Sequence, residues 1–167
     1  MTYKYNGIIK NDFSAAPGVS TTIFVQGCPH KCFNCHNPET WSFNGGQEFT
    51  TETMQEVLDA LKANGIKRSL SIMGGEPLCP QNIPLTLYII DNVIKELPEI
   101  EIYVWTGYLY EELLQSTDTA LKTILGLINV LIDGPYIDSE RDITLKMRGS
   151  RNQRIINLKE VYKNESL

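Results

Sequence analysis

The chain has 167 residues, enough for one domain with a well-buried core but fewer than the roughly 250 residues of a closed eight-stranded (β/α) barrel. Its formal net charge of -5 disfavours nucleic acids and anionic membrane surfaces as partners, because both attract basic proteins. No apolar stretch approaches the roughly 18 residues of a membrane span and the N-terminus does not resemble a signal peptide, so we expect a cytoplasmic protein.

Taken in chain order, short apolar and β-branched runs alternate with segments of helical periodicity. The runs predict strands over residues 3–13, 21–26, 69–73, 100–105, 129–132 and 154–158. The periodic segments predict helices over residues 54–64, 82–97, 109–114 and 118–125, and Thr50, Thr51 or Thr53 can cap the first of them. The second helix has clear start and stop signals, because Asn82 suits its N-cap, Pro84 suits its first turn and Pro98 ends it. The tail from Asp138 to Gly149 is polar and predicts a loop.

This alternation predicts the α/β fold class. The strands are nearly continuous apolar runs, which is typical of a parallel sheet covered by helices. Four or five strand-helix units fit the length, so we expect an open, partial (β/α) barrel. No internal repeat or low-complexity linker divides the sequence, which predicts a single domain over residues 1–167.

Three cysteines stand directly after the first predicted core strand. Cys28, Cys32 and Cys35 have C-x3-C-x2-C spacing within a turn-rich segment, and we expect their thiolates to converge on one point. A structural zinc site or a complete ferredoxin-type cluster takes four protein ligands. Three thiolates would therefore leave one position of the metal centre without a protein ligand and open to a substrate or cofactor.

A zinc site is the alternative interpretation of the same segment. His30, His36 or the distant Cys79 could supply its fourth ligand. The spacing favours iron–sulfur, because zinc ribbons use paired C-x2-C motifs. The crowding of the cysteines does not suit a disulfide framework, and a reducing compartment would keep them free as metal ligands.

Glycines stand at the ends of the predicted core strands and predict a shared ligand cleft, since they allow the backbone to approach a ligand closely. They are Gly27, Gly74, Gly75, Gly107 and Gly134. The most specific of these strand ends has the sequence Gly74-Gly75-Glu76-Pro77, in which exposed backbone groups lie beside a glutamate and a stiff proline.

The cysteine loop followed by Gly-Gly-Glu-Pro at the next strand end resembles the radical S-adenosylmethionine superfamily. Within it, the chain resembles the anaerobic ribonucleoside-triphosphate reductase-activating proteins. The matching stretches are residues 22–28, the three cysteines, and residues 36–41, 73–78, 105–108, 133–136 and 148–154. The related pyruvate formate-lyase activating enzymes share the cysteine loop, but they are usually longer and lack the Arg-Gly-Ser-x-Asn-Gln-Arg tail.

The resemblance implies a partial TIM-like barrel of the radical SAM type and a single radical SAM domain. Cys28, Cys32 and Cys35 would bind three irons of a 4Fe-4S cluster, and the open iron would chelate the amino and carboxylate groups of S-adenosylmethionine. The residues implied to contact that cofactor are Gly74, Gly75 and Glu76 at its amino end and Asn34, Cys35 and His36 beside its adenine. Family members often carry an aromatic residue where this chain has Asn34, and Phe33 is the candidate substitute.

The implied activity is glycyl-radical installation. Cleavage of S-adenosylmethionine would give a 5'-deoxyadenosyl radical that takes a hydrogen atom from a glycine of the anaerobic reductase, with a flavodoxin-like protein as the electron donor. The alternatives are an activase of another glycyl radical enzyme, of the pyruvate formate-lyase type, and a zinc or iron–sulfur module without catalysis.

Five further residues have two interpretations each. Cys79 is a fourth metal ligand or an ordinary free cysteine. Asp133 contacts the ribose or the partner, or belongs to a plain Asp-Gly-Pro turn. Arg148, Arg151 and Arg154 dock the reductase or belong to a solvated tail.

Overall fold

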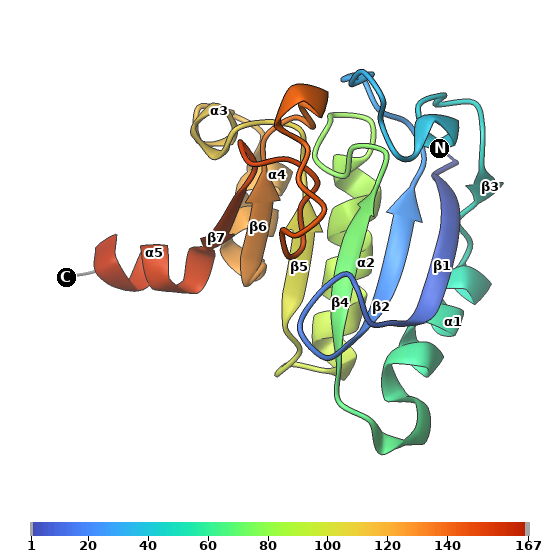
Figure 1. Ribbon diagram of the computed structural model, residues 1–167. Helices are drawn as coiled ribbons and strands as arrows, with labels where there is room; N and C mark the ends of the chain where they lie inside the picture. Colours follow the sequence, from blue (N-terminus) through green and yellow to red (C-terminus); the bar gives the residue numbers. More distant parts are fainter. Residues whose placement is uncertain (1, 166–167) are drawn as a thin grey trace.

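The computed structural model describes residues 2–165 and folds them around one seven-stranded sheet (Figure 1). The strands are β1 (Lys4–Asp12), β2 (Val19–Val25), β3 (Gln47–Glu48), β4 (Arg68–Gly74), β5 (Ile102–Trp105), β6 (Val130–Asp133) and β7 (Arg154–Asn157). The helices are α1 (Thr51–Lys62), α2 (Ile83–Glu96), α3 (Tyr110–Leu114), α4 (Thr119–Leu127) and α5 (Leu158–Glu165). The strand order is β3-β1-β2-β4-β5-β6-β7, so the described part of the chain is an open, mixed α/β fold.

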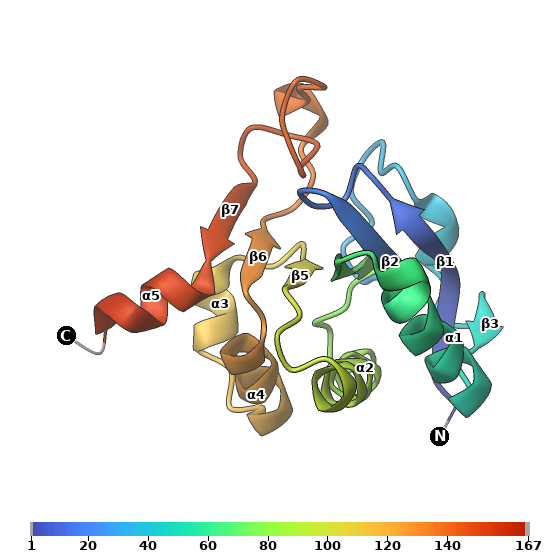
Figure 2. The ribbon, with the colours of Figure 1, turned by 90° about the horizontal axis from the view of Figure 1, so that it is seen from below.

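Four neighbouring strands, β2, β4, β5 and β6, run parallel. This confirms the strand-helix repeats predicted from the sequence. Figure 2 shows helices α1, α2 and α4 on one side of the sheet. The carboxyl ends of the parallel strands lie at the same end of the sheet, at Val25, Gly74, Trp105 and Asp133. The loops that carry the predicted motifs begin there.

Antiparallel strands flank this parallel core on both sides. β1 pairs with β2 and β3 pairs with β1, which confirms the strand predicted near the N-terminus. β7 lies where the last strand was predicted, but it runs against β6 rather than continuing the parallel series. Between these two strands the described chain has a loop with one short 3-10 helix, η3 (Asp138–Glu140), and no α-helix that would carry it back along the sheet. The chain therefore re-enters at the same end of the sheet and pairs antiparallel. Helix α5 was not predicted.

Two predicted helix starts have different outcomes. At α1 the Thr50 hydroxyl accepts the Thr53 backbone N–H at 3.2 Å, and the Thr53 hydroxyl accepts the Thr50 N–H at 3.2 Å, which forms a capping box. Asn82 stands before α2, but its side chain does not cap that helix. It donates instead to the backbone carbonyls of Gly27, at 3.1 Å, and Glu76, at 2.9 Å. Asn82 therefore joins two strand-end loops.

The main hydrophobic cluster includes the apolar faces of α1, α2 and α4 and the sheet side chains that meet them. Val57, Ile89 and Ile124, one from each helix, are fully buried, as expected for helices that cover one face of a sheet. None of the helices within residues 2–165 combines the length and apolar character needed to cross a membrane.

Candidate functional site

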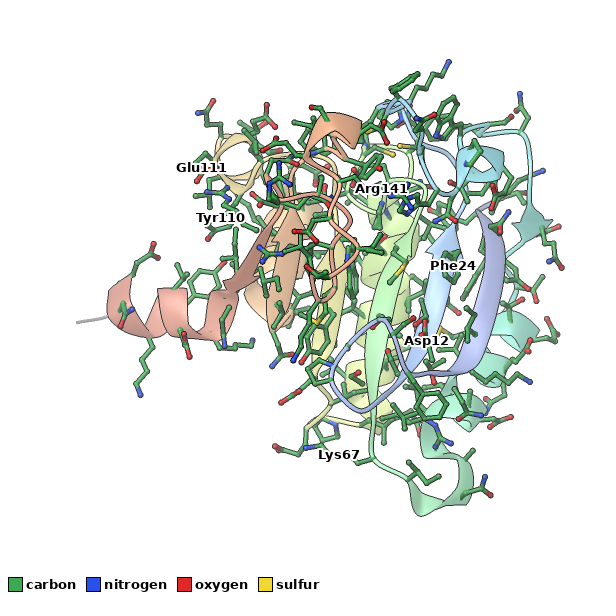
Figure 3. All side chains as sticks on the ribbon, viewed as in Figure 1. Asp12, Phe24, Lys67, Tyr110, Glu111 and Arg141 are labelled. Atoms are coloured by element: carbon green, nitrogen blue, oxygen red, sulfur yellow. The ribbon has the colours of Figure 1, made fainter. Side chains whose placement is uncertain are left out.

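A cavity of about 570 Å³ connects the strand-end loops with the face of the sheet opposite the main hydrophobic cluster. Its wall includes Phe24 on β2 and Asp12 at the end of β1, both labelled in Figure 3. Because side chains alternate across a strand, Phe24 lines the cavity while its neighbour Ile23 packs in the main core. The loop after β6 supplies Met147 and Arg148 to the same wall.

The cysteine loop is closed at its base by backbone hydrogen bonds. The N–H of Gly27 donates to the carbonyl of Thr40 at 2.7 Å, and that of Cys28 donates to the carbonyl of Trp41 at 3.1 Å. Gly27 has φ +101°, and an added Cβ would lie 2.1 Å from the ring of Phe43. Only glycine fits this left-handed and crowded position, so the loop leaves β2 in a fixed direction.

The three cysteines are half-buried and line the same cavity. Within residues 2–165, no three His, Cys, Asp or Glu side chains are placed to hold a single metal ion, and the convergence of the three thiolates stays a prediction. Burial raises the pKa of the Cys28 thiol, against the opposing effect of the His30 and Lys31 backbone amides. The sulfur of Cys35 accepts the Asn37 backbone N–H at 3.4 Å. Three free cysteines on the wall of one cavity suit an iron–sulfur cluster, which takes its thiolates at different irons.

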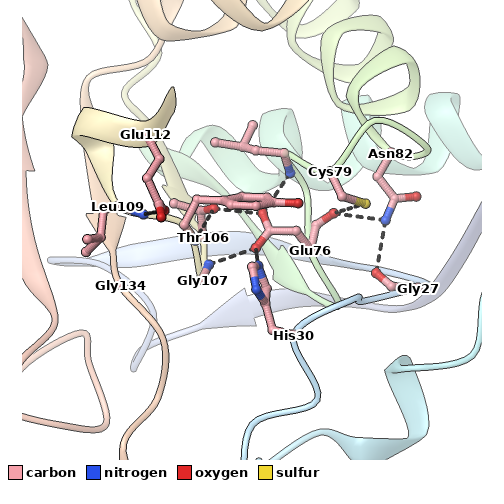
Figure 4. Close-up of polar contacts among 12 residues, drawn as sticks. Gly27, His30, Glu76, Cys79, Asn82, Thr106, Gly107, Leu109, Glu112 and Gly134 are labelled. Carbon is pink, nitrogen blue, oxygen red and sulfur yellow. Dashed lines mark hydrogen bonds and ion pairs between the residues drawn. The ribbon is translucent and has the colours of Figure 1, made fainter. Parts of the chain in front are cut away.

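The carboxylate of Glu76 joins three loops at the strand ends (Figure 4). One oxygen accepts the Gly107 N–H at 2.7 Å and lies 2.6 Å from Nε2 of His30. The other accepts the Leu78 N–H at 2.9 Å and the Thr106 hydroxyl at 2.8 Å. A carboxylate offers about four acceptor positions, and these four contacts occupy them all. Glu76 is only 1% exposed.

The two glycines before Glu76 allow β4 to end directly against β2. A Cβ on Gly74 would lie 2.7 Å from the Phe24 backbone, and one on Gly75 would lie 2.3 Å from the Gly27 carbonyl oxygen. The Glu76 N–H donates to that same carbonyl at 2.8 Å. These glycines are therefore required by the approach of one backbone to another, and both also line the cavity.

Comparison with known proteins gives this site a family. A model of the 4Fe-4S single cluster domain matches residues 15–156. The anaerobic ribonucleoside-triphosphate reductase-activating protein of Escherichia coli K12 is 40% identical over 149 residues, which are 89% of this chain and 94% of that protein. This chain belongs to the family of anaerobic ribonucleoside-triphosphate reductase-activating proteins.

Relatives of the same name extend beyond the enterobacteria. The Vibrio cholerae protein is 39% identical over 143 residues, covering 85% of this chain and 90% of the relative. The bacteriophage T4 protein is 37% identical over 153 residues, covering 90% of this chain and 92% of the relative. The family model supports an iron–sulfur cluster over zinc, and the names favour reductase activation over activation of pyruvate formate-lyase.

In this member of the reductase-activating family, the residues predicted to flank adenine do not all face the cavity. Asn34 has φ +55° and its side-chain amide donates to Asp138 at 3.2 Å, outside the cavity wall. The two residues that follow it do line the wall. The ring of His36 lies 5.0 Å from that of Tyr136. Phe33, the candidate aromatic substitute, is 76% exposed and does not line the cavity.

The residues considered as a fourth zinc ligand have other contacts. Cys79 is fully buried outside the cavity wall, and its thiol donates to the Glu76 carbonyl at 3.2 Å. Burial raises the pKa of this thiol to about 11. His30 packs edge-on against Tyr108, with ring centroids 4.5 Å apart. Its contact with Glu76 was not predicted, and its only sequence signal is the position between two cysteines.

The Arg-Gly-Ser-x-Asn-Gln-Arg motif folds against the loop after β6. The side-chain oxygen of Gln153 accepts the Gly149 N–H at 2.9 Å and the Ser150 N–H at 3.1 Å. Its amide nitrogen donates to the Gly134 carbonyl at 3.1 Å. Gln153 thus holds the motif in a closed turn beside the end of β6.

Asp133 and Arg154 are tied to each other at the other end of this motif. The fully buried Asp133 carboxylate accepts the Tyr110 N–H at 2.8 Å and pairs with the Arg154 guanidinium. Arg154 also pairs with Glu111 at 2.7 Å and lowers the pKa of that carboxyl to about 2. These contacts favour structural roles for Asp133 and Arg154 over the ribose contact and the docking role.

Proposed function

We propose that this chain is a radical SAM activase that installs a glycyl radical in an anaerobic ribonucleoside-triphosphate reductase, acting in the cytoplasm as a single radical SAM domain over residues 1–167. The carrying observation is one cavity lined by three cysteines and the Gly-Gly-Glu loop, in a chain whose relatives are named as activators of that reductase. The open sheet with four parallel strands supports its assignment as the partial barrel of the radical SAM type.

Cys28, Cys32 and Cys35 would hold the 4Fe-4S cluster. Their thiols are free, half-buried and in one cavity, and the family model is that of a 4Fe-4S domain, so the donor set fits the group. When bound and reduced, by a flavodoxin-like donor, the cluster supplies the electron that cleaves S-adenosylmethionine to methionine and a 5'-deoxyadenosyl radical, which takes a hydrogen atom from a glycine of the reductase.

Gly74, Gly75 and Glu76 would hold the amino end of S-adenosylmethionine through backbone groups. The position of Gly74, Gly75 and Glu76 on the cavity wall supports this assignment, and the Glu76 carboxylate is already paired within the protein. The backbone around Asn34, Cys35 and His36 would flank the adenine. Apolar wall residues, Phe24 among them, would keep water from the reactive radical.

Cofactor cleavage tests the proposal. The protein would be reconstituted anaerobically with iron and sulfide, reduced with dithionite and mixed with S-adenosylmethionine, and 5'-deoxyadenosine would be measured. We expect product from the native chain and none from Cys32→Ala. Cys79→Ala is the matched control, because Cys79 lies outside the cavity wall, and it should keep both cluster and product. A colourless, zinc-loaded protein without cleavage would refute the enzyme assignment.

The partner requires a second experiment. The reduced, cofactor-loaded protein would be mixed with an anaerobic ribonucleoside-triphosphate reductase or with pyruvate formate-lyase, and the glycyl radical measured by electron paramagnetic resonance. We expect the doublet in the reductase alone. A signal in pyruvate formate-lyase alone would contradict the assigned partner while leaving the radical chemistry intact.

A further inference from the structure

Arg148 is the one member of the Arg-Gly-Ser-x-Asn-Gln-Arg motif that lines the cavity with a cationic side chain. Among residues 2–165 no other lysine or arginine lines that wall. Its guanidinium donates once, to the Gln153 carbonyl at 2.9 Å. The Nε atom is buried and has no hydrogen-bond partner within the described chain. No carboxylate of residues 2–165 forms an ion pair with Arg148.

The loop around Arg148 is held in one conformation. Met147 has φ +62°, a left-handed conformation that is unfavourable for a side chain of this size. The indole N–H of Trp105 donates to the Met147 carbonyl at 2.6 Å and stabilises this arrangement. On the other side, an added Cβ on Gly149 would lie 3.1 Å from Tyr136 and 3.6 Å from His36. Arg148 is thus presented beside the end of the cysteine loop.

The acids of the cavity do not neutralise this charge. Asp12 accepts the Ser14 N–H and hydroxyl and the Thr22 hydroxyl, and its hydrogen bonds lower its pKa against the effect of burial. The acceptor positions of the Glu76 carboxylate are taken by four contacts within the protein. A partly buried cation with an unpaired donor is costly unless an anion satisfies it. The guanidinium fork matches the geometry of a carboxylate.

We propose that Arg148 binds the carboxylate of the methionine portion of S-adenosylmethionine through the terminal nitrogens of its guanidinium. The inference rests on the proposed function and adds to it the residue that recognises the anionic end of the cofactor. A carboxylate of the reductase is the other source of the same chemistry, and the experiment separates the two.

The test is anaerobic titration calorimetry on reconstituted protein, with S-adenosylmethionine and with its decarboxylated analogue as ligands. A hydrogen-bonded charge pair of this kind contributes about 1.5–3 kcal/mol, so Arg148→Gln should weaken S-adenosylmethionine binding by roughly tenfold to a hundredfold. The analogue should bind the variant and the native protein equally, since it lacks the carboxylate. Arg151→Gln, an exposed arginine of the same motif, should change neither affinity.

Iron content and far-ultraviolet circular dichroism should match the native protein in every variant that enters the comparison. If Arg148→Gln fails this check, Arg148→Lys takes its place, because lysine keeps the positive charge but lacks the planar guanidinium. The loss of affinity in this variant should again be confined to S-adenosylmethionine. Equal weakening of both ligands would indicate a structural role and overturn the proposal. Unchanged binding with loss of radical transfer to the reductase would assign Arg148 to a partner carboxylate and also overturn it. A native protein that binds no S-adenosylmethionine would instead refute the proposed function itself.

Discussion

Glu76→Gln tests whether the strand-end loops are held together by one buried carboxylate. The substitution keeps the size of the side chain and replaces one acceptor oxygen by an NH2 group. Placed at one oxygen position, that group faces the Gly107 N–H; placed at the other, it faces the Leu78 N–H. Either rotamer therefore sets two donors against each other, and a buried backbone N–H loses its acceptor.

The magnitude follows from these contacts. A buried N–H left unpaired costs about 1–3 kcal/mol, and hydrogen bonds to a charged acceptor contribute roughly 1.5–3 kcal/mol each. Because part of the network survives through the remaining oxygen, we expect Glu76→Gln to lower the free energy of unfolding by about 2–4 kcal/mol. Urea denaturation of the metal-free protein measures that loss. Hydrogen exchange should locate it, with reduced protection at the amides of Gly107 and Leu78.

Glu96→Gln is the matched control, since Glu96 pairs with Lys62 at 2.6 Å but both side chains are exposed. An exposed pair contributes about 0–1 kcal/mol, so this variant should stay close to the native stability. The reasoning fails if Glu76→Gln costs no more than Glu96→Gln, or if the Gly107 amide keeps its protection. Either result would mean that the loops are positioned without the carboxylate.

Gly75→Ala tests close packing near the site, with Gly126→Ala as its control, and Cys79→Ala tests the effect of burial on a thiol. Gly75→Ala should destabilise by about 2–4 kcal/mol in urea denaturation, because its Cβ meets the Gly27 carbonyl, whereas Gly126→Ala in α4 meets nothing and should stabilise by up to about 1 kcal/mol; equal effects would contradict the close-approach argument. Burial raises the pKa of Cys79 to about 11 from an ordinary value of 9.0, so the native state should lose stability as pH rises from 9.0 toward 11, and Cys79→Ala should lack this slope; parallel pH profiles would refute the burial effect.

Periodicity predicted the parallel core because each of its elements is specified locally. A run as short as residues 69–73 that ends at two glycines favours a buried strand, and Val57 and Leu61 share the buried face of α1. The cysteine loop and the glycine-bearing strand ends were also visible, since both are defined by short spacings. These features required no knowledge of which distant residues meet.

The features that were missed depend on contacts between distant residues. His30 and Glu76 are 46 positions apart, and nothing local distinguishes this histidine from one in a solvated loop. Asn82 has the sequence position of a helix cap, yet two carbonyls at the strand ends take its amide. The direction of β7 depends on a return loop whose conformation Gln153 holds through side-chain contacts.

The polar residues at the strand ends divide into those that build the site and those left to face a ligand. Glu76, His30 and Asn82 satisfy one another and the neighbouring backbone, so their side chains fix where the loops lie. Such internal pairing makes a site rigid, but it also uses the charges that a ligand would need. Under the proposed function, recognition of the amino-acid portion of S-adenosylmethionine would then fall to backbone groups at its amino end and to an unpaired cation at its carboxylate. Arg148 is the arginine on the described wall that remains available for that contact.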